Sequence, residues 1–130
     1  MKRKILIVED NVGLSQIQKD WLSRAGYDAV TAMSEPIARS LIRKTQFDLI
    51  LSDVRLPEGD GISLLEWLRK EKKDIPFIIT TEFVSVPDVV RTIKLGARDY
   101  LPKPVHREHL LELAEDVFHP VATVRKQERQ

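Results

Sequence analysis

Four short apolar runs lie along the chain, and each of them leads into polar or charged residues. Together with the polar or charged residues that follow them, the four runs form segments 5–10, 49–53, 77–81 and 99–104. An apolar run of this length between polar residues is typical of a strand buried on both faces, as in a parallel sheet. A weaker strand pattern covers residues 28–31, so the chain predicts five strands.

Between these strands, apolar residues recur at helical spacing and predict five helices. The residues expected to face the core are, in chain order, Leu14, Ile17, Trp21, Leu22 and Ala25, then Ile37, Ala38, Leu41 and Ile42, then Ile62, Leu65 and Leu68, then Val89, Val90 and Ile93, and finally Leu110, Leu113, Ala114, Val117 and Phe118. Ser34 is a suitable cap for the second helix, and Pro87 opens the fourth. Strands that alternate with helices of this size predict an α/β fold, with a doubly wound five-stranded parallel sheet and five helices.

The helical periodicity stops near residue 118. A folded domain over residues 1–118 is therefore expected, followed by a polar, basic segment over residues 119–130. The second segment is interpreted as a linker or as the start of a following region. A length of 130 residues suits one domain with a normal core.

Composition and charge exclude several classes of function. The chain has no cysteine, so it forms no disulfide, no thiolate metal site and no cysteine nucleophile. Its formal net charge of +1 gives no reason to expect binding to nucleic acid or to an anionic membrane. The basic start of the chain is followed by too short an apolar run for a signal peptide, and no segment is long enough to span a bilayer. We therefore expect a cytoplasmic domain with no direct nucleic acid binding and no membrane contact.

Five chemically reactive residues follow the ends of the predicted strands: Glu9, Asp10, Asp53, Thr81 and Lys103. In open parallel sheets, ligands bind just beyond the carboxyl ends of the strands, so these side chains should converge on one edge. Two carboxylates at about 4 Å repel each other by roughly 4 kcal/mol at an effective dielectric of about 20. A hard cation removes this penalty, and Mg²⁺ prefers oxygen ligands. The cluster therefore predicts a site for Mg²⁺ and a phosphoryl group.

Asp53 stands alone at the end of its strand and is the natural nucleophile, because a carboxylate can attack phosphorus and form an acyl phosphate. Lys103 can pair with an oxygen of the phosphoryl group, and Thr81 offers it a hydroxyl. Each residue alone has an ordinary interpretation, such as a helix-start acid, a turn former or a surface charge. Their joint occurrence at corresponding strand ends favours phosphoryl transfer onto the protein itself.

The chain closely resembles a known family, the receiver domains of two-component response regulators. The matching segments are Val8-Glu9-Asp10-Asn11, Ser52-Asp53-Val54-Arg55-Leu56-Pro57, Asp60-Gly61, Ile79-Thr80-Thr81 and Leu95-Gly96-Ala97-Arg98-Asp99-Tyr100-Leu101-Pro102-Lys103-Pro104. They cover about the first 118 residues and keep the family register throughout. The resemblance implies the receiver type of the flavodoxin-like fold.

The resemblance also implies a role for each matching residue. Asp53 would be the phosphoacceptor and Lys103 the partner of the phosphoryl group, while Thr81 and Tyr100 would be the switch residues. The ligands of Mg²⁺ would be Glu9, Asp10, Asp53 and the backbone carbonyl of Arg55. Family members usually have a cis peptide at the position of Lys103-Pro104, and proline is the residue that tolerates it.

By the same resemblance, a partner sensor histidine kinase phosphorylates Asp53, and the face built by the fourth helix, fifth strand and fifth helix then changes its partner. Val84, Val86, Val90 and Tyr100 would contribute to this face, which is also the candidate surface for a homodimer. The chain looks most like receivers that precede a σ54-interacting ATPase and a DNA-binding domain, as in NtrC-like transcription regulators. The implied protein is a bacterial signalling switch and no enzyme beyond its own phosphorylation and dephosphorylation.

Two positions depart from the family pattern. Glu82 follows the switch threonine where a small residue is usual, and an inward side chain there would slow phosphorylation, although we expect it to point to solvent. Gly59 stands where methionine is common.

Three alternatives remain beside the leading hypothesis. The first is a degenerate receiver that binds partners without phosphorylation. The second is a Mg²⁺-dependent phosphatase of the haloacid dehalogenase type, which is disfavoured because Arg55 occupies the place of its second acid. The third is a flavodoxin-type flavin carrier, whose phosphate Glu9 and Asp10 would repel.

Overall fold

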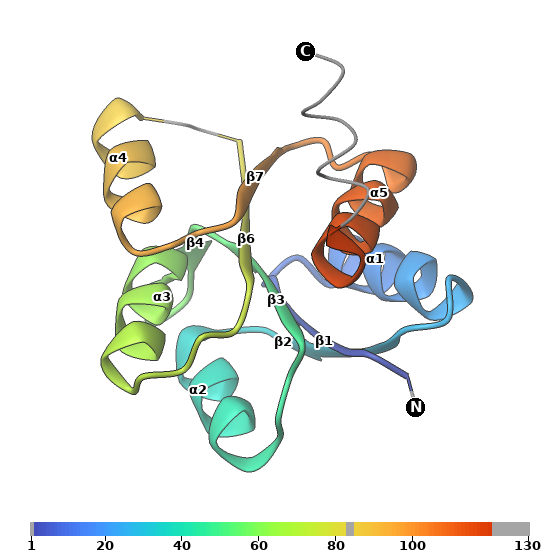
Figure 1. Cartoon of the computed structure of the whole chain (residues 1–130), viewed down its shortest axis with the longest axis horizontal. Helices are drawn as coiled ribbons and strands as arrows, with labels where there is room; N and C mark the ends of the chain where they lie inside the picture. The colour runs from blue at the N-terminus through green and yellow to red at the C-terminus, as the bar shows by residue number, and fades with distance from the viewer. Residues whose placement is uncertain (1, 83–84, 121–130) are drawn as a thin grey trace.

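The computed structural model describes residues 2–82 and 85–120, and its centre is a five-stranded parallel sheet. The strands are β1 (Lys4–Val8), β2 (Asp28–Ala32), β3 (Leu49–Asp53), β6 (Phe77–Thr81) and β7 (Asp99–Pro102), arranged in the order β2-β1-β3-β6-β7 (Figure 1). Each pair of neighbours in this order is parallel. The predicted fold class is confirmed.

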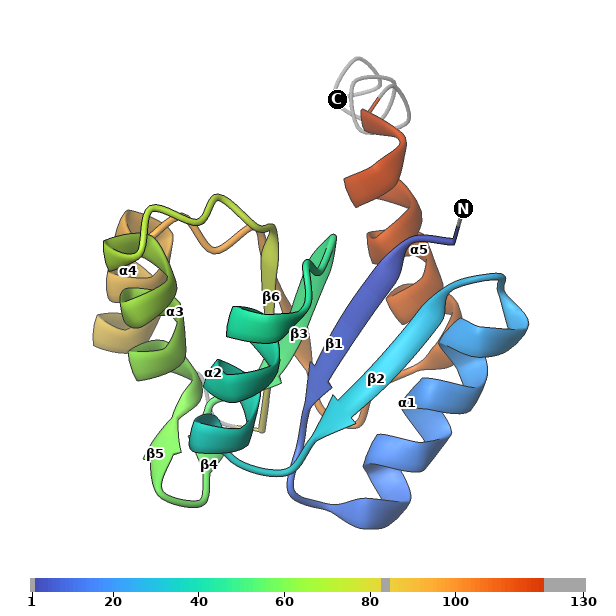
Figure 2. The same ribbon diagram turned by 90° about the horizontal axis from the view of Figure 1, so that it is seen from below.

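Five helices among residues 2–82 and 85–120 cover the two faces of the sheet. They are α1 (Val12–Arg24), α2 (Glu35–Lys44), α3 (Gly61–Lys70), α4 (Val86–Lys94) and α5 (Arg107–Phe118). Helices α1 and α5 lie on one face, and α2, α3 and α4 lie on the other (Figures 1 and 2). None of the helices in the described part of the chain is long and apolar enough to cross a membrane.

Side-chain caps begin four of the five helices. The side chains of Asn11, Ser34, Asp60 and Ser85 each accept a hydrogen bond from the backbone N–H three residues further on. Such caps satisfy amides that have no partner within the helix. The predicted cap at Ser34 is confirmed. In each of these four helices, the capping residue directly precedes the first helical residue.

Alternate strand residues point to opposite faces of the sheet and are buried in two separate cores. Leu6, Val8 and Ile50 pack toward α2 and α3, whereas Ile5 and Ile7 pack toward α1 and α5. Because both faces of the sheet are covered, the strands carry continuous apolar runs rather than an alternating pattern. This burial explains why the sequence pattern located the strands so well.

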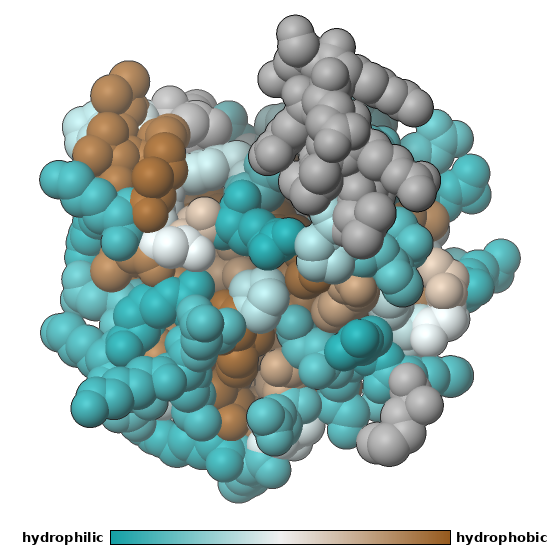
Figure 3. Space-filling model, in the orientation of Figure 1, coloured by the Kyte–Doolittle hydropathy of each residue, from teal (hydrophilic) through white to brown (hydrophobic). Residues whose placement is uncertain are grey.

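Ile17 of α1 and Ile37 of α2 were expected to face the core, but they are 48% and 49% exposed, so these two predictions are wrong. Helix α4 differs from its prediction more strongly. Its buried residue is Thr92, whereas Val90 and Ile93, which were expected to face the core, are 45% and 63% exposed. The Thr92 hydroxyl donates to the carbonyl of Val89 and lies beside the hydroxyl of Tyr100, so the inward face of α4 is partly polar. Apolar spacing therefore gave the wrong face for Val90 and Ile93, and Figure 3 shows apolar side chains on the surface over α4.

A small hairpin takes the place of the loop expected after β3. Strand β4 (Arg55–Leu56) pairs antiparallel with β5 (Gly59–Asp60), and Pro57 and Glu58 form the turn. Strands of two residues are too short to leave a periodic signal, which is why the sequence pattern showed only a loop. The hairpin joins the end of β3 to the start of α3 and lies directly beside the candidate site.

Candidate functional site

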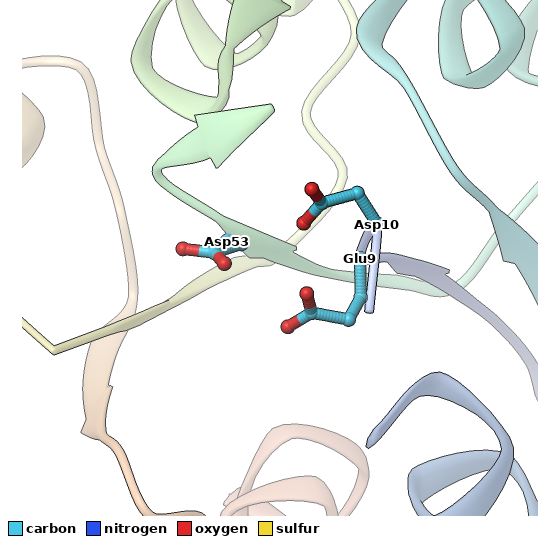
Figure 4. A group of neighbouring side chains, drawn as sticks. All are labelled: Glu9, Asp10 and Asp53. Atoms are coloured by element: carbon cyan, nitrogen blue, oxygen red, sulfur yellow. The ribbon is translucent and has the colours of Figure 1, made fainter. Parts of the chain in front are cut away.

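Three carboxylates lie together beyond the carboxyl ends of β1 and β3. Glu9 and Asp10 follow β1, and Asp53 is the last residue of β3. One oxygen of each lies within 4.8 Å of the others, and Figure 4 shows the three side chains extending to the same side. Glu9 and Asp53 are buried, with exposed fractions of 2% and 8%, whereas Asp10 is exposed. Because β1 and β3 are paired neighbours, the fold brings together residues that are more than 40 positions apart.

Lys103 connects two of these carboxylates. Its Nζ donates to Glu9 Oε1 and to Asp53 Oδ2, both at 2.7 Å. The residue follows β7, and its backbone N–H donates to the carbonyl of Thr81 at 3.0 Å. The peptide bond between Lys103 and Pro104 is cis, as the resemblance implies.

Burial and hydrogen bonding act in opposite directions on the charged groups of the site. Burial raises the pKa of Glu9 above its ordinary value, and hydrogen bonds from Lys103 and the Asn11 N–H only partly offset this rise. Burial alone would lower the pKa of Lys103, but its hydrogen bonds to Asp53 and Glu9 outweigh burial, so the pKa is raised. Lys103 is therefore firmly protonated at neutral pH.

The donor set suits a divalent cation. Three carboxylates against one ammonium leave an excess of negative charge, and each of the three offers an oxygen, the ligand type that Mg²⁺ prefers. Arg55 begins β4, and its N–H donates to Asp53 Oδ1 at 3.3 Å, which keeps its backbone beside the same carboxylate. These residues fit the metal that the sequence analysis expected.

The two expected switch residues lie in different surroundings. Thr81 ends β6, is 5% exposed and pairs with Pro102 of β7, and its carbonyl accepts the backbone N–H of Lys103. Tyr100 is half-buried in β7, and its hydroxyl lies 2.5 Å from Thr92 Oγ1 and donates to the carbonyl of Asp88 at 3.3 Å. Tyr100 therefore contacts α4 rather than the carboxylate cluster. The sequence analysis missed Thr92, because a threonine between Arg91 and Ile93 carries no signal that distinguishes it.

Glu82, the main departure from the family pattern, is exposed, as expected. Its charge therefore does not enter the site.

The face expected to carry the output is formed here by α4, β7 and α5, and we refer to it as the α4–β7–α5 face. Val86 and Val90 of α4 are 75% and 45% exposed, and the hydroxyl of Tyr100 contacts the same helix at the carbonyl of Asp88. Val84 lies outside the described residues, as do residues 121–130 of the expected linker.

Glu35, at the start of α2, is a residue to which the sequence analysis assigned no role. It is only 4% exposed, and its Oε1 accepts the backbone N–H of Asp60 at 2.9 Å. In the sequence it looks like an ordinary acidic residue in a first helical turn, so no local signal distinguishes it.

The profile of the family described as "Response regulator receiver domain" matches residues 5–115. The chain belongs to this family. The receiver is 40% identical to the transcriptional regulatory protein ZraR of Salmonella typhimurium over 114 residues, which cover 88% of this chain and 26% of ZraR. It is 33% identical to the response regulator protein PilR of Pseudomonas aeruginosa over 86% of this chain and 25% of PilR. The chain thus spans about a quarter of these relatives.

The fold of the receiver agrees with a solved structure of the same kind. The crystal structure of a CheY-like receiver domain protein from Methanospirillum hungatei matches with a TM-score of 0.86 and 29% identity. The match covers 99% of this chain and 98% of that one. Sequence and fold therefore place the carboxylate cluster and Lys103 in the setting of a receiver domain.

Proposed function

We propose that Asp53 accepts a phosphoryl group from a partner histidine kinase in a Mg²⁺-dependent reaction. The observation that carries this proposal is the buried Asp53 carboxylate, which lies within 4.8 Å of Glu9 and Asp10 and is bonded to Lys103. The proposed ligands of the metal are Glu9, Asp10, Asp53 and the backbone carbonyl of Arg55. A bound Mg²⁺ would supply charge neutralisation for the incoming phosphoryl group.

The reaction is a transfer of one phosphoryl group between two side chains. An oxygen of Asp53 attacks the phosphorus of the kinase phosphohistidine, a P–O bond forms as the P–N bond breaks, and the imidazole nitrogen leaves with its electron pair. Lys103 already lies 2.7 Å from Asp53 Oδ2, so its ammonium can pair with an oxygen of the transferred group. The Thr81 hydroxyl donates to another of these oxygens. Later attack by water on phosphorus releases phosphate and restores the Asp53 carboxylate.

The consequence proposed for the rest of the domain is a population shift at the α4–β7–α5 face. Movement of Thr81 toward the phosphoryl group changes the space beside β7, and Tyr100 transmits this change because its hydroxyl contacts Thr92 and the carbonyl of Asp88 in α4. The exposed Val86 and Val90 then present a different surface to a partner or to a second copy of the chain.

The proposed output is control of transcription, since the relatives named above include a transcriptional regulatory protein and a response regulator protein. We propose that residues 1–118 form the receiver of a longer, cytoplasmic regulator of the σ54-interacting class and that residues 119–130 lead toward its next region. The receiver itself would then act as a switch, and its only chemistry would be its own phosphorylation and dephosphorylation.

The test is incubation with Mg²⁺ and acetyl phosphate, followed by measurement of the intact mass. A mass gain of one phosphoryl group is expected, which Asp53→Asn and chelation of the metal should both abolish. No gain in a folded protein would contradict the proposal and favour a receiver that works without phosphorylation. Glu82→Ala is a useful companion, because the exposed position of Glu82 predicts an unchanged rate.

A further inference from the structure

Glu35 is a buried carboxylate that lies outside the phosphoacceptor site. It is the first residue of α2, with an exposed fraction of 4%. Its Oε2 forms an ion pair with Arg39, one turn further along the helix, and its Oε1 accepts the N–H of Asp60 at 2.9 Å. A carboxylate removed from water is unfavourable unless its oxygens are hydrogen-bonded, and both oxygens of Glu35 have partners.

The partner of Glu35 belongs to the hairpin that follows the phosphoacceptor. Asp60 is the last residue of β5, and its own side chain caps α3 by accepting the N–H of Ser63 at 2.6 Å. At the base of the hairpin, the N–H of Gly61 donates to the carbonyl of Val54 at 2.7 Å. Two hydrogen bonds thus hold the hairpin: one joins Gly61 to Val54, the residue after Asp53, and the other joins Asp60 of β5 to Glu35 of α2.

Gly59 makes this contact possible. Its φ of +153° lies in a region that side-chain-bearing residues rarely adopt, and a Cβ placed there would lie 3.0 Å from the Cβ of Glu35 and overlap its carboxylate. The glycine and the glutamate are therefore a matched pair: the missing side chain at position 59 leaves the space that the Glu35 carboxylate occupies.

Arg39 extends the contact to α3. Its guanidinium pairs with Glu35 and lies 5.2 Å from the centre of the Trp67 ring, over its face. Cation–π contacts of this kind attract an arginine to an indole ring. Glu35 and Arg39 together therefore connect α2, the hairpin and α3.

We propose that Glu35 is a positioning residue for the divalent cation site. By holding the Asp60 N–H, its carboxylate keeps the hairpin in one arrangement, and the hairpin begins with Arg55, whose N–H contacts Asp53 Oδ1. The carbonyl of Arg55 is then already in position before a cation binds. Cation binding therefore does not have to offset the entropy lost when the hairpin becomes ordered. This inference rests on the proposed function, because it assumes that the Arg55 carbonyl is a ligand.

The experiment compares Glu35→Ala and Glu35→Gln with the wild-type protein. Alanine removes the acceptor for the Asp60 N–H, whereas glutamine keeps an oxygen there and loses only the charge opposite Arg39. Asp20→Ala is the matched control, because Asp20 and Arg24 form an acid–arginine pair with the same spacing on the exposed surface of α1. Two readouts are taken on each protein: amide hydrogen exchange over residues 55–60 without metal, and the Kd for Mg²⁺ from calorimetric titration.

The expected result is faster exchange of the hairpin amides in Glu35→Ala and about tenfold weaker Mg²⁺ binding, the scale of loss seen when a group that orients a metal ligand is removed. Glu35→Gln should stay within about twofold of wild type in Kd, and Asp20→Ala should be unchanged. A merely structural role would destabilise the fold and leave the Kd of the folded protein unaltered.

Three outcomes would overturn the inference. Unchanged hairpin exchange in Glu35→Ala would show that the hairpin does not depend on this contact. Faster exchange with an unchanged Kd would show that hairpin order does not matter for the metal, and the proposed function would still stand if the wild-type protein gains a phosphoryl group. A wild-type protein that binds no Mg²⁺ would overturn the inference together with the proposed function.

Discussion

Helices α3 and α4 lie side by side on the same face of the sheet, yet they are attached to it in very different ways (Figures 1 and 2). Helix α3 buries five residues, Gly61, Ile62, Leu64, Leu65 and Leu68. Helix α4 buries one, Thr92, and leaves Val86, Val90 and Ile93 exposed. Since apolar burial supplies most of the free energy that fixes a helix, we expect α3 to be held more firmly than α4, and we propose that α4 is the helix that moves when the site changes.

The position of each helix along the chain agrees with this division. Helix α3 follows the hairpin beside Asp53, next to the candidate site. Helix α4 follows Thr81 and Glu82, at the end of the strand that carries the proposed switch hydroxyl. In the proposed function, the domain thus separates a firmly packed chemical centre from a loosely packed output element.

Truncation of a buried side chain should give the largest difference in stability between variants of α3 and α4. Leu65 of α3 is fully buried, so Leu65→Ala should lower the free energy of unfolding by about 2–5 kcal/mol, because it removes apolar contacts and leaves a cavity. Ile93 of α4 is 63% exposed, so Ile93→Ala should change it by less than about 0.5 kcal/mol. Urea denaturation measures both, and equal losses would contradict the different attachment of the two helices.

Arg69 should produce the next largest effect, because it connects the end of α3 to the end of α4. Its guanidinium donates to the carbonyls of Leu95 and Gly96 at 2.8 and 3.1 Å, and also to those of Lys73 and Ile75. Arg69→Ala removes these four hydrogen bonds, three of which are partly buried, and should cost about 1–3 kcal/mol in unfolding free energy.

Amide hydrogen exchange should show which residues lose stability in Arg69→Ala. Residues 93–97 should exchange faster in Arg69→Ala, while the core of α3 keeps its protection. Arg24→Ala, which removes an exposed arginine on α1, serves as the control and should leave both regions unchanged.

The hydroxyl of Tyr100 should contribute less. Tyr100→Phe removes its contacts with Thr92 and with the carbonyl of Asp88, and a net loss of about 0.5–1.5 kcal/mol is expected. Thr92→Val should give a similar loss, and the double variant should lose less than the sum, because both single changes remove the same contact. Additive losses in urea denaturation would show that the two hydroxyls act independently.

The ion pair between Glu66 of α3 and Arg91 of α4 should give the smallest effect, and it should depend on pH. The hydrogen bond from Arg91 lowers the pKa of Glu66, with a further contribution from Lys70. A carboxyl whose pKa is lower in the folded state adds stability above its unfolded pKa and loses it as the pH falls through the folded value.

The measurement is the difference in unfolding free energy between wild type and Arg91→Ala as a function of pH. A small difference should be present at neutral pH and should vanish as the pH falls below the lowered pKa of Glu66. In Arg91→Ala, the pKa of Glu66 measured by NMR titration should rise toward its ordinary value. An unchanged pKa would show that the ion pair does not connect the two helices.

The contrast between α3 and α4 also explains what the sequence could predict. Strand β1 (Lys4–Val8) is buried on both faces along Ile5 to Val8, so its apolar run identifies it without any knowledge of its neighbours. The carboxylates and Lys103 follow such strands, and the topology of a parallel sheet brings them together. The fold and the proximity of the main site residues were therefore readable from the chain.

Features that depend on tertiary packing could not be read in this way. The apolar residues of α4 predicted the wrong inward face, because Thr92 is buried through its contact with Tyr100. The proposed role of Glu35 depends on Gly59, 24 positions away, and the hairpin that Glu35 contacts has strands of only two residues. Such pairings arise between segments that only the folded chain brings into contact.

The central claim is that phosphorylation of Asp53 moves α4 and leaves α3 in place. The most direct test measures amide hydrogen exchange over both helices before and after treatment with acetyl phosphate and Mg²⁺, with Asp53→Asn as the control. The account predicts altered exchange in α4 and near Tyr100, unaltered exchange in α3, and no response in Asp53→Asn. Full phosphorylation with unchanged exchange in α4, or with equal changes in both helices, would contradict it.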